Sequence, residues 1–314
     1  MHRRSLLLAA PALLADLPPR AMAQQGLPVV ASFTILGDML RQVGGDRLAL
    51  RVIAGPEADA HSFQPRPSDA EAMRGAALLV RNGLGFDAWF DRLARAAGGN
   101  PLTVTATEGI EPRSMDAHAH SHGGTERRTQ HSVGPRRVAD PHAWQDVRLA
   151  QSYVRSIARG LVAADPAGAP RHERAAAEYI RRLEALDAWV RAQVATVPPA
   201  RRRVITGHHA FGYFAAAYGV EFLAPQGVST AAEPSAAEVA RLIRQIREEG
   251  ITAVFVESAG SPATLERLAR EAGVRVRGQL YADALSAPGG PAPTYEAMVR
   301  HNVGLIVPAM RGEG

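Results

Sequence analysis

The sequence predicts an α/β protein made of two parallel-sheet α/β domains that are joined by a long rigid helix. Three observations support this fold class. The 314 residues are enough for two domains of ordinary size. In both halves, short apolar stretches bounded by glycine and proline alternate with helical patterns, which is typical of a parallel sheet covered by helices. One uninterrupted helical pattern, over residues 171–196, separates the two halves.

The composition narrows the classes of protein to which the chain can belong. It has 46% hydrophobic and 21% charged residues, the proportions of a globular protein rather than of a disordered or fibrous one. Because it has no cysteine, it has no disulfide framework, thiolate zinc finger or cysteine nucleophile. Its net charge of +5 comes from arginines spread among acidic residues, without a nucleic-acid recognition motif. We therefore expect no nucleic-acid partner, and any metal must be bound by nitrogen and oxygen atoms.

Residues 1–23 have the pattern of an export signal peptide. Two arginines precede the apolar stretch Leu6–Ala15, and a small-x-small cleavage site, Ala21-Met22-Ala23, precedes Gln24. The apolar stretch is too short to span a bilayer, and no later stretch is long enough. Because a lipid anchor requires a cysteine after the signal, we expect a chain that is released into the periplasm and is not embedded in a membrane.

The first domain is expected over residues 24–165. Four strands alternate with helices in its first part, and this order favours a parallel sheet. Between residues 112 and 139 the pattern fails, because the segment is rich in His, Arg, Gly and Ser, and we expect a long flexible loop there. A helix follows near residues 147–163. The expected strands are Val29–Phe33, Leu48–Ile53, Ala77–Arg81 and Leu102–Ala106.

A linking helix is expected within residues 166–197. From Arg171 to Thr196, apolar side chains recur at helical spacing, and Pro198-Pro199 ends the pattern. At 1.5 Å per residue, such a helix extends over roughly 38 Å, about the length of two adjacent domains. We therefore expect a stiff connection that permits small rocking movements rather than wide hinge closure.

The second domain is expected over residues 198–314 and repeats the α/β order. Ser235 and Glu238 form a capping box at the start of one helix, and Gly250 ends that helix. The expected strands are residues 204–206, 251–256 and 274–281, and the other expected helices are residues 211–218 and 263–271.

Four short segments each place a potential metal ligand in a loop next to regular structure. Three of them follow expected strands, and two come from each half of the chain. In open α/β sheets, ligands gather outside the carboxyl ends of the strands, so these segments can face a shared cleft. The segments are Ala60-His61-Ser62-Phe63-Gln64-Pro65, Asp140-Pro141-His142-Ala143-Trp144, Gly207-His208-His209-Ala210-Phe211 and Leu280-Tyr281-Ala282-Asp283.

Three imidazoles and one carboxylate complete a tetrahedral shell of the kind that Zn²⁺ accepts. Imidazole also suits copper, iron and nickel, whereas manganese favours more oxygen ligands, so zinc is the preferred metal. Each residue also has a simpler role open to it. His142 suits a turn or core position, His61 can cap a turn, and Asp283 can cap a helix that begins at the next residue. Of the adjacent pair His208-His209, only one is expected to point inward.

These motifs, in this order, resemble the periplasmic solute-binding proteins of zinc and manganese ABC importers, the ZnuA-like and TroA-like receptors. The resemblance extends over most of the chain after residue 23. It implies two α/β domains joined by a rigid helix, with one metal ion in the interdomain cleft. Besides the four ligand segments, it includes Ala31-Ser32-Phe33-Thr34-Ile35-Leu36-Gly37-Asp38, Gly44-Gly45-Asp46, Gly83-Leu84-Gly85-Phe86-Asp87-Ala88-Trp89, Gly227-Val228-Ser229-Thr230 and Glu233-Pro234-Ser235.

The resemblance also implies the ligands and the function. His61, His142 and His208 match the imidazole positions of the family, and Asp283 matches its carboxylate. His209 stands where relatives often have an acidic or small residue, so the choice within the pair stays open, with His208 favoured. Manganese-preferring relatives often place glutamate at the third position, so a histidine there favours zinc. The expected function is a high-affinity receptor, not an enzyme, that delivers Zn²⁺ to an inner-membrane ABC permease. The alternative is a Mn²⁺ receptor of the same family.

A histidine-rich tract lies between the first two ligand segments. Such tracts bind metals weakly, and zinc-type relatives often carry a similar insertion, which implies a role in collecting or sensing zinc. The simpler alternative is a solvated loop with incidental histidines. We expect the tract to be dispensable for the main site. Its candidate ligands are Asp116, His118, His120, His122 and His131.

Two other classes of protein fit the sequence less well than the receptor does. A secreted zinc hydrolase would keep an open coordination position and a general base beside the metal, and the chain has none of the His-Glu-x-x-His, Gly-x-Ser-x-Gly or phosphate-loop motifs. An adhesin-like relative is a further alternative, and the missing lipid-anchor cysteine argues against it. We expect a monomer, since a receptor that docks on a permease need not self-associate. Glu257, at the end of its strand, is expected to orient a ligand from outside the shell.

Overall fold

The N-terminal lobe contains a sheet of four parallel strands. A computed structural model describes residues 26–116, 137–227, 230, 234–258 and 262–313. The strand order is β2-β1-β3-β4, with β1 between β2 and β3. The strands are β1 (Leu27–Phe33), β2 (Leu48–Ala54), β3 (Leu78–Arg81) and β4 (Leu102–Thr105).

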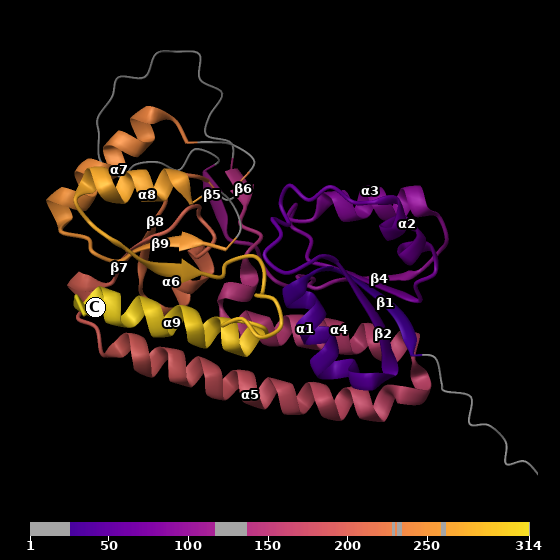
Figure 1. Cartoon of the computed structure of the whole chain (residues 1–314). Helices are drawn as coiled ribbons and strands as arrows, with labels where there is room; N and C mark the ends of the chain where they lie inside the picture. Colours follow the sequence, from indigo (N-terminus) through magenta and orange to yellow (C-terminus); the bar gives the residue numbers. More distant parts are fainter. Residues whose placement is uncertain (1–25, 117–136, 228–229, 231–233, 259–261, 314) are drawn as a thin grey trace, which may run out of the picture.

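Helices cover both faces of this sheet. On the lower face in Figure 1, α1 (Thr34–Gly44) and α4 (Val147–Ala164) pack against the strands. On the upper face lie α2 (Pro67–Arg74) and α3 (Ala88–Ala97), which pack against each other. All four strands are parallel, because a helix-containing connection links each strand to the next. The carboxyl ends of the strands therefore lie along one end of the sheet.

The C-terminal lobe repeats this plan. Its four parallel strands have the order β10-β9-β7-β8. Helices α7 and α8 pack together above the sheet, and α9 lies below it (Figure 1). The elements are β7 (Arg203–Ile205), α6 (Gly212–Tyr218), β8 (Glu221–Leu223), α7 (Ala236–Glu249), β9 (Val254–Glu257), α8 (Ala263–Ala272), β10 (Val276–Leu280) and α9 (Tyr295–Arg311).

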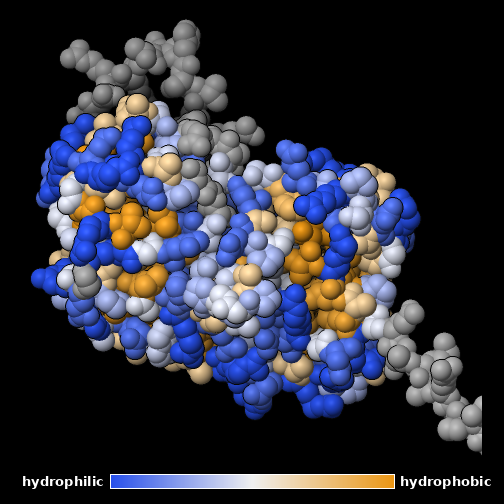
Figure 2. Space-filling model, in the orientation of Figure 1, coloured by the Kyte–Doolittle hydropathy of each residue, from blue (hydrophilic) through white to orange (hydrophobic). Residues whose placement is uncertain are grey.

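A single helix, α5 (Ala169–Ala195), runs beneath both lobes. Its 27 residues correspond to a length of about 40 Å, and it packs against α1 and α4 of the first lobe and α9 of the second. Figure 2 shows mostly hydrophilic side chains along the lower border of the molecule, where α5 runs. The helix is therefore a continuous support for both lobes. Its buried positions are His172, Ala176, Tyr179, Leu183, Leu186, Val190 and Val194.

The hydrophobic core also joins the lobes. One continuous cluster of buried side chains includes Phe33 and Trp144 of the first lobe together with Phe211, Leu280 and Tyr295 of the second. A separate, smaller cluster belongs to the second lobe alone, where α7 and α8 cover the outer face of its sheet. Because burial of apolar area is the main favourable term in folding, the shared core resists separation of the lobes.

The observed elements confirm the predicted α/β fold class of two parallel-sheet domains and a long helix. The capping box at Ser235 and Glu238 is present, with each side chain accepting a hydrogen bond from the other residue's backbone N–H. Two elements, β8 and α9, were not predicted from the sequence. Strand β8 has only three residues, and α9 contains Gly304 and Pro308, which mask its helical pattern.

The expectation of an irregular loop throughout residues 112–139 was wrong at both ends of the segment. Strands β5 (Ser114–Asp116) and β6 (Arg137–Ala139) pair in an antiparallel ribbon. Backbone hydrogen bonds hold such a ribbon without large apolar side chains, which is why composition did not reveal it. Among the described residues, no helix is both long and apolar enough to cross a bilayer.

Candidate metal centre

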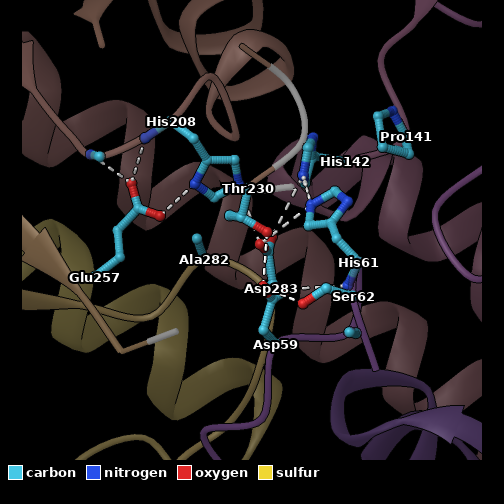
Figure 3. A network of polar contacts seen from close by, with 12 residues as sticks. Asp59, His61, Ser62, Pro141, His142, His208, Thr230, Glu257, Ala282 and Asp283 are labelled. Carbon is cyan, nitrogen blue, oxygen red and sulfur yellow. Dashed lines mark hydrogen bonds and ion pairs between the residues drawn. The ribbon is translucent and has the colours of Figure 1, made fainter. Parts of the chain in front are cut away.

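Four side chains that are distant in the sequence meet between the two lobes (Figure 3). His61 lies in the loop after β2 and His142 follows β6, while His208 follows β7 and Asp283 follows β10. One ligand atom from each residue lies within 4.8 Å of the other three. The structure thus brings together all four residues that the sequence analysis selected for the main site.

The Nε2 atoms of the three imidazoles surround the Asp283 carboxylate. His61 Nε2 and His208 Nε2 lie 3.4 and 3.1 Å from Oδ2, and His142 Nε2 lies 3.4 Å from Oδ1. The Nε2 atoms of His61 and His142 are 3.1 Å apart. For comparison, ligands 2.0–2.1 Å from a tetrahedral zinc ion are separated by about 3.3 Å. These four separations match that value, and all the ligand atoms lie within 4.8 Å of one another, so the side chains are close enough to bind one ion together.

The centre is buried and leaves polar atoms without hydrogen bonds. The side chains of His142 and Asp283 are fully buried, and those of His61 and His208 are 5% and 1% exposed. Among the described residues, His208 Nε2 and both carboxylate oxygens of Asp283 make no hydrogen bond of good geometry, although His208 Nε2 and Asp283 Oδ2 lie 3.1 Å apart. Burying polar atoms without hydrogen bonds is costly, so these atoms need another interaction in place of hydrogen bonds to water. Imidazole nitrogens and carboxylate oxygens offer electron pairs, and a bound cation would accept them.

The charges of the centre are strongly coupled. Burial alone would raise the pKa of Asp283, but His208 and His142 beside it hold that pKa well below its usual value. Burial opposes a charge on His208 too, yet the carboxylates of Glu257 and Asp283 raise its pKa well above the usual value. Burial lowers the pKa of His61, which Asp283 only partly offsets. Without a cation, His208 and Asp283 thus stabilise each other as an ion pair.

Two of the ligands, His61 and His142, each lie in a turn of the same kind. In the sequence these turns appear as a repeated Asp-x-His pattern. Asp59 Oδ1 accepts a hydrogen bond from the backbone N–H of His61 (2.9 Å), and Asp140 Oδ1 accepts one from that of His142 (3.0 Å). Such turns, closed by an aspartate side chain, fix the backbone without a helix or strand. Asp140 Oδ1 also lies 2.8 Å from Nδ1 of His142, which directs Nε2 into the centre. Neither aspartate is predicted from the sequence to orient a ligand.

Glu257, the last residue of β9, holds His208 through both of its oxygens. Oε2 lies 2.5 Å from His208 Nδ1, and Oε1 accepts hydrogen bonds from the backbone N–H groups of Gly207 (2.7 Å) and His208 (3.2 Å). One carboxylate therefore fixes both the loop and the ring, as the sequence analysis expected (Figure 3).

Further contacts surround the centre. Phe86 packs edge-on against the His61 ring, with ring centres 4.6 Å apart, and Trp144 does so against His142 at 5.2 Å. On the other side, Thr230 Oγ1 of the C-terminal lobe donates a hydrogen bond to Asp59 Oδ2 of the N-terminal lobe (2.7 Å). The aromatic rings lower the local dielectric constant, which strengthens electrostatic interactions in the centre.

The remaining candidate residues are placed as follows. His209 is not in the cluster, and its backbone N–H donates to Gly227 O (3.0 Å). Residues 284–294, directly after Asp283, contain no helix, so Asp283 does not cap one. Asp116 is the last residue of β5. The four histidines of the predicted auxiliary tract, His118, His120, His122 and His131, lie outside the described residues.

Comparison of the sequence with known families finds one match over nearly the whole chain. Residues 29–309 match the family described as zinc-uptake complex component A, periplasmic (ZnuA). Similar proteins include the manganese-binding lipoprotein MntA of Halalkalibacterium halodurans, 32% identical over 90% of this chain and 88% of that protein. The iron-binding protein YfeA of Yersinia pestis is 31% identical over 95% and 91% of the two chains.

Solved structures give the same result. The periplasmic zinc-binding protein TroA of Treponema pallidum superposes with a TM-score of 0.79 at 30% identity, over 91% of this chain and 99% of that chain. The manganese-bound periplasmic metal-binding protein of Candidatus Liberibacter asiaticus gives a TM-score of 0.75 at 26% identity, over 90% and 98% of the two chains. By their names, these proteins bind zinc, manganese or iron.

Proposed function

This chain belongs to the family of the periplasmic component A of zinc-uptake complexes, and on that premise we propose that it is a high-affinity Zn²⁺ receptor. Members of this family are metal-binding receptors of ABC importers, not enzymes. In our proposal His61, His142, His208 and Asp283 bind the ion as cargo. The receptor then delivers it to an inner-membrane ABC permease.

The observation that carries the choice of zinc is the donor set. Three buried imidazole Nε2 atoms and one carboxylate, spaced 3.1–3.4 Å apart where they contact Asp283, are the ligands and the spacing that a four-coordinate zinc ion accepts. A catalytic zinc usually keeps a position open for water. Four protein ligands supply the whole shell, which suits capture and delivery better than hydrolysis.

Manganese is the second candidate, and one feature of the centre favours it. Both oxygens of Asp283 face the imidazoles, Oδ1 toward His142 and Oδ2 toward His61 and His208. A bidentate carboxylate would add a fifth ligand and a second oxygen, which suits the harder Mn²⁺ ion. Three of the similar proteins are named for manganese.

A competition titration tests the choice of metal. The chelator-stripped protein is titrated with Zn²⁺ and Mn²⁺, each against a chromophoric chelator of known affinity, and the bound metal is counted. We expect one tightly bound zinc ion and much weaker manganese binding, as the donor set and the Irving–Williams order both predict. Manganese binding tighter than zinc would overturn the assignment. If the protein had no tight site for either metal, the proposed receptor function would be refuted.

We further propose that residues 1–23 are removed on export and that the mature chain, beginning at Gln24, is free and monomeric in the periplasm. The signal-peptide pattern and the absence of cysteine support this proposal. Mass spectrometry of the periplasmic fraction, with light scattering of the purified protein, provides the test. A mass that still includes residues 1–23, or one increased by a lipid, would contradict it.

The tract from Asp116 to His131 is proposed to bind zinc weakly and to feed the main centre. Its support is its composition, since histidine-rich tracts bind metals. Deleting residues 117–131 should lower the total zinc bound at high zinc concentration and leave one tight ion unchanged. Loss of that tight ion would show that the tract belongs to the main site.

A further inference from the structure

Asp283 belongs by sequence to the C-terminal lobe, but the loop that carries it is hydrogen-bonded to the N-terminal lobe. The carbonyl oxygen of Ala282 accepts hydrogen bonds from Trp144 Nε1 and from Gln145 Nε2, each 2.9 Å long. Both donors lie in the short 3₁₀ helix Ala143–Gln145, directly after His142. The residue before the carboxylate ligand is therefore attached to the segment that carries an imidazole ligand.

Two further bonds attach the other side of the same loop. The backbone N–H of Leu285 donates to Thr34 Oγ1 at the start of α1 (2.8 Å), and the backbone N–H of Glu57 donates to Leu285 O (3.2 Å). Thr34 and Glu57 both belong to the N-terminal lobe. Asp283 thus lies between two attachment points, Ala282 and Leu285, that are both on that lobe.

The attachment to the C-terminal lobe ends one residue earlier. The backbone of Tyr281 exchanges two hydrogen bonds with the Asn302 side chain on α9, of 3.0 and 2.7 Å. The backbone and Nδ1 of His208, by contrast, are bonded within its own lobe, to Glu257 of β9 and to the hydroxyl of Thr206, which donates to His208 O (3.1 Å). The His142 segment also accepts hydrogen bonds from two tyrosines of the C-terminal lobe, from Tyr213 Oη to Asp140 O (3.2 Å) and from Tyr295 Oη to Trp144 O (2.5 Å). The bonds at Ala282 and Leu285 nevertheless group Asp283 with His61 and His142 rather than with His208, so the ligands divide three to one.

We propose that His61, His142 and Asp283 form a three-ligand half-site carried by the N-terminal lobe, which His208 completes from the C-terminal lobe. In this arrangement Gln145 is a positioning residue for Asp283. A small shift of the lobes opens the shell by moving one ligand, while the other three stay assembled. An incoming zinc ion can bind the half-site first and is enclosed when His208 arrives. This inference rests on the proposed function.

A set of affinity measurements tests the proposal. Gln145→Met removes one donor to Ala282 O and keeps the length of the side chain, and Gln42→Met is the matched control. Gln42 accepts a hydrogen bond from Arg182 (2.5 Å) and does not contact the centre. Zinc affinity is measured by chelator competition in the wild-type, His208→Ala and Asp283→Ala backgrounds, with the unfolding midpoint of each protein as a check on folding.

We expect Gln145→Met to weaken zinc binding about tenfold in the wild-type and His208→Ala backgrounds, the cost typical of losing a residue that orients a metal ligand. It should have no effect in the Asp283→Ala background, and Gln42→Met should have none in any. If Gln145→Met weakened zinc binding equally with and without Asp283, or had no effect in the His208→Ala background, the half-site proposal would be refuted. Should Gln145→Met fail to fold, Trp144→Phe removes the other donor to the same carbonyl. A wild-type protein without tight zinc binding would instead refute the proposed function.

Distances between spin labels give an independent readout. The chain has no cysteine, so labels attach only where cysteines are introduced. Exposed positions are Ala96 on α3, Ala287 in the Asp283 loop and Arg244 on α7. Between Ala96→Cys and Ala287→Cys, we expect the same distance with and without zinc, whereas that between Ala96→Cys and Arg244→Cys should change. A change in the first distance, or constancy of the second, would contradict the division of the ligands.

Discussion

At the scale of single residues, the adjacent histidines 208 and 209 differ in what they contact. His208 points at Asp283 and is oriented by Glu257, whereas His209 is outside the ligand cluster. Tertiary contacts make this distinction, because both histidines have the same intrinsic chemistry. The pair therefore offers a ligand and a control in consecutive positions.

We predict that His208→Ala weakens zinc binding by at least about a hundredfold, since losing a ligand costs more than losing a residue that orients one. His209→Ala should change the affinity less than about threefold. Both affinities can be measured by chelator competition on stripped protein. Comparable losses in the two variants would show that the second histidine also coordinates.

The raised pKa of His208 predicts a pH dependence of binding. Zinc binds only the deprotonated imidazole, and in the metal-free protein Glu257 and Asp283 stabilise the protonated form. Each zinc ion should therefore release about one proton at pH 7, and the affinity should fall about tenfold per pH unit as the pH decreases. Calorimetric titration in buffers of different ionisation enthalpy measures this release. Affinity that is unchanged between pH 8 and pH 6 would contradict the prediction.

At the scale of secondary-structure elements, the N-terminal lobe depends on the close approach of α4 to its sheet. A Cβ atom on Gly160 would lie 2.4 Å from the Cγ2 methyl group of Val104 on β4. A valine side chain has little rotameric freedom with which to avoid this overlap. Glycine is therefore required here by packing, although it is unfavourable in a helix.

A pair of glycine substitutions tests this packing. Gly160→Ala should lower the free energy of unfolding by about 1–2 kcal/mol, because overpacking outweighs the gain in helix propensity. Gly304→Ala, on the exposed side of α9 with no atom within 4 Å of the added Cβ, should raise it by about 0.5–1 kcal/mol. Urea unfolding of the zinc-free variants measures both effects. A loss of stability at both sites would point to a general effect of the substitution instead.

At the scale of the whole molecule, the centre couples metal binding to stability. It draws ligands from both lobes, and it buries polar atoms that make no hydrogen bond. A ligand that binds only the folded state stabilises it by about 4 kcal/mol at a free concentration 1,000 times its Kd. The ion thus adds to the shared core and to α5 in holding the lobes together.

Removal of zinc should therefore lower the thermal unfolding midpoint by about 10 °C, as calorimetry of the loaded and chelator-treated protein would show. Asp283→Ala, which removes the carboxylate ligand, should reduce this difference strongly. Mg²⁺ should not replace zinc, because it prefers oxygen ligands. A midpoint that does not depend on zinc would place the ion outside the folded core.

Local patterns in the sequence were sufficient for most of the fold. Strands such as β1 and β2, and the helix α5, follow from apolar periodicity and from the breakers at their ends, because those signals lie within a few residues of one another. Strand β8 and the β5–β6 ribbon could not be found in this way. Each is three residues long, and backbone pairing with a distant or neighbouring strand stabilises it.

The chain by itself determined which side chains can bind a metal: imidazoles and carboxylates in loops after strands, with no thiol available. Only the tertiary structure decided how they are held. The orientation of His208 by Glu257 and the attachment of the Asp283 loop to the opposite lobe are contacts between distant segments. Such contacts depend on how two sheets are packed over one helix, and no local pattern encodes that packing.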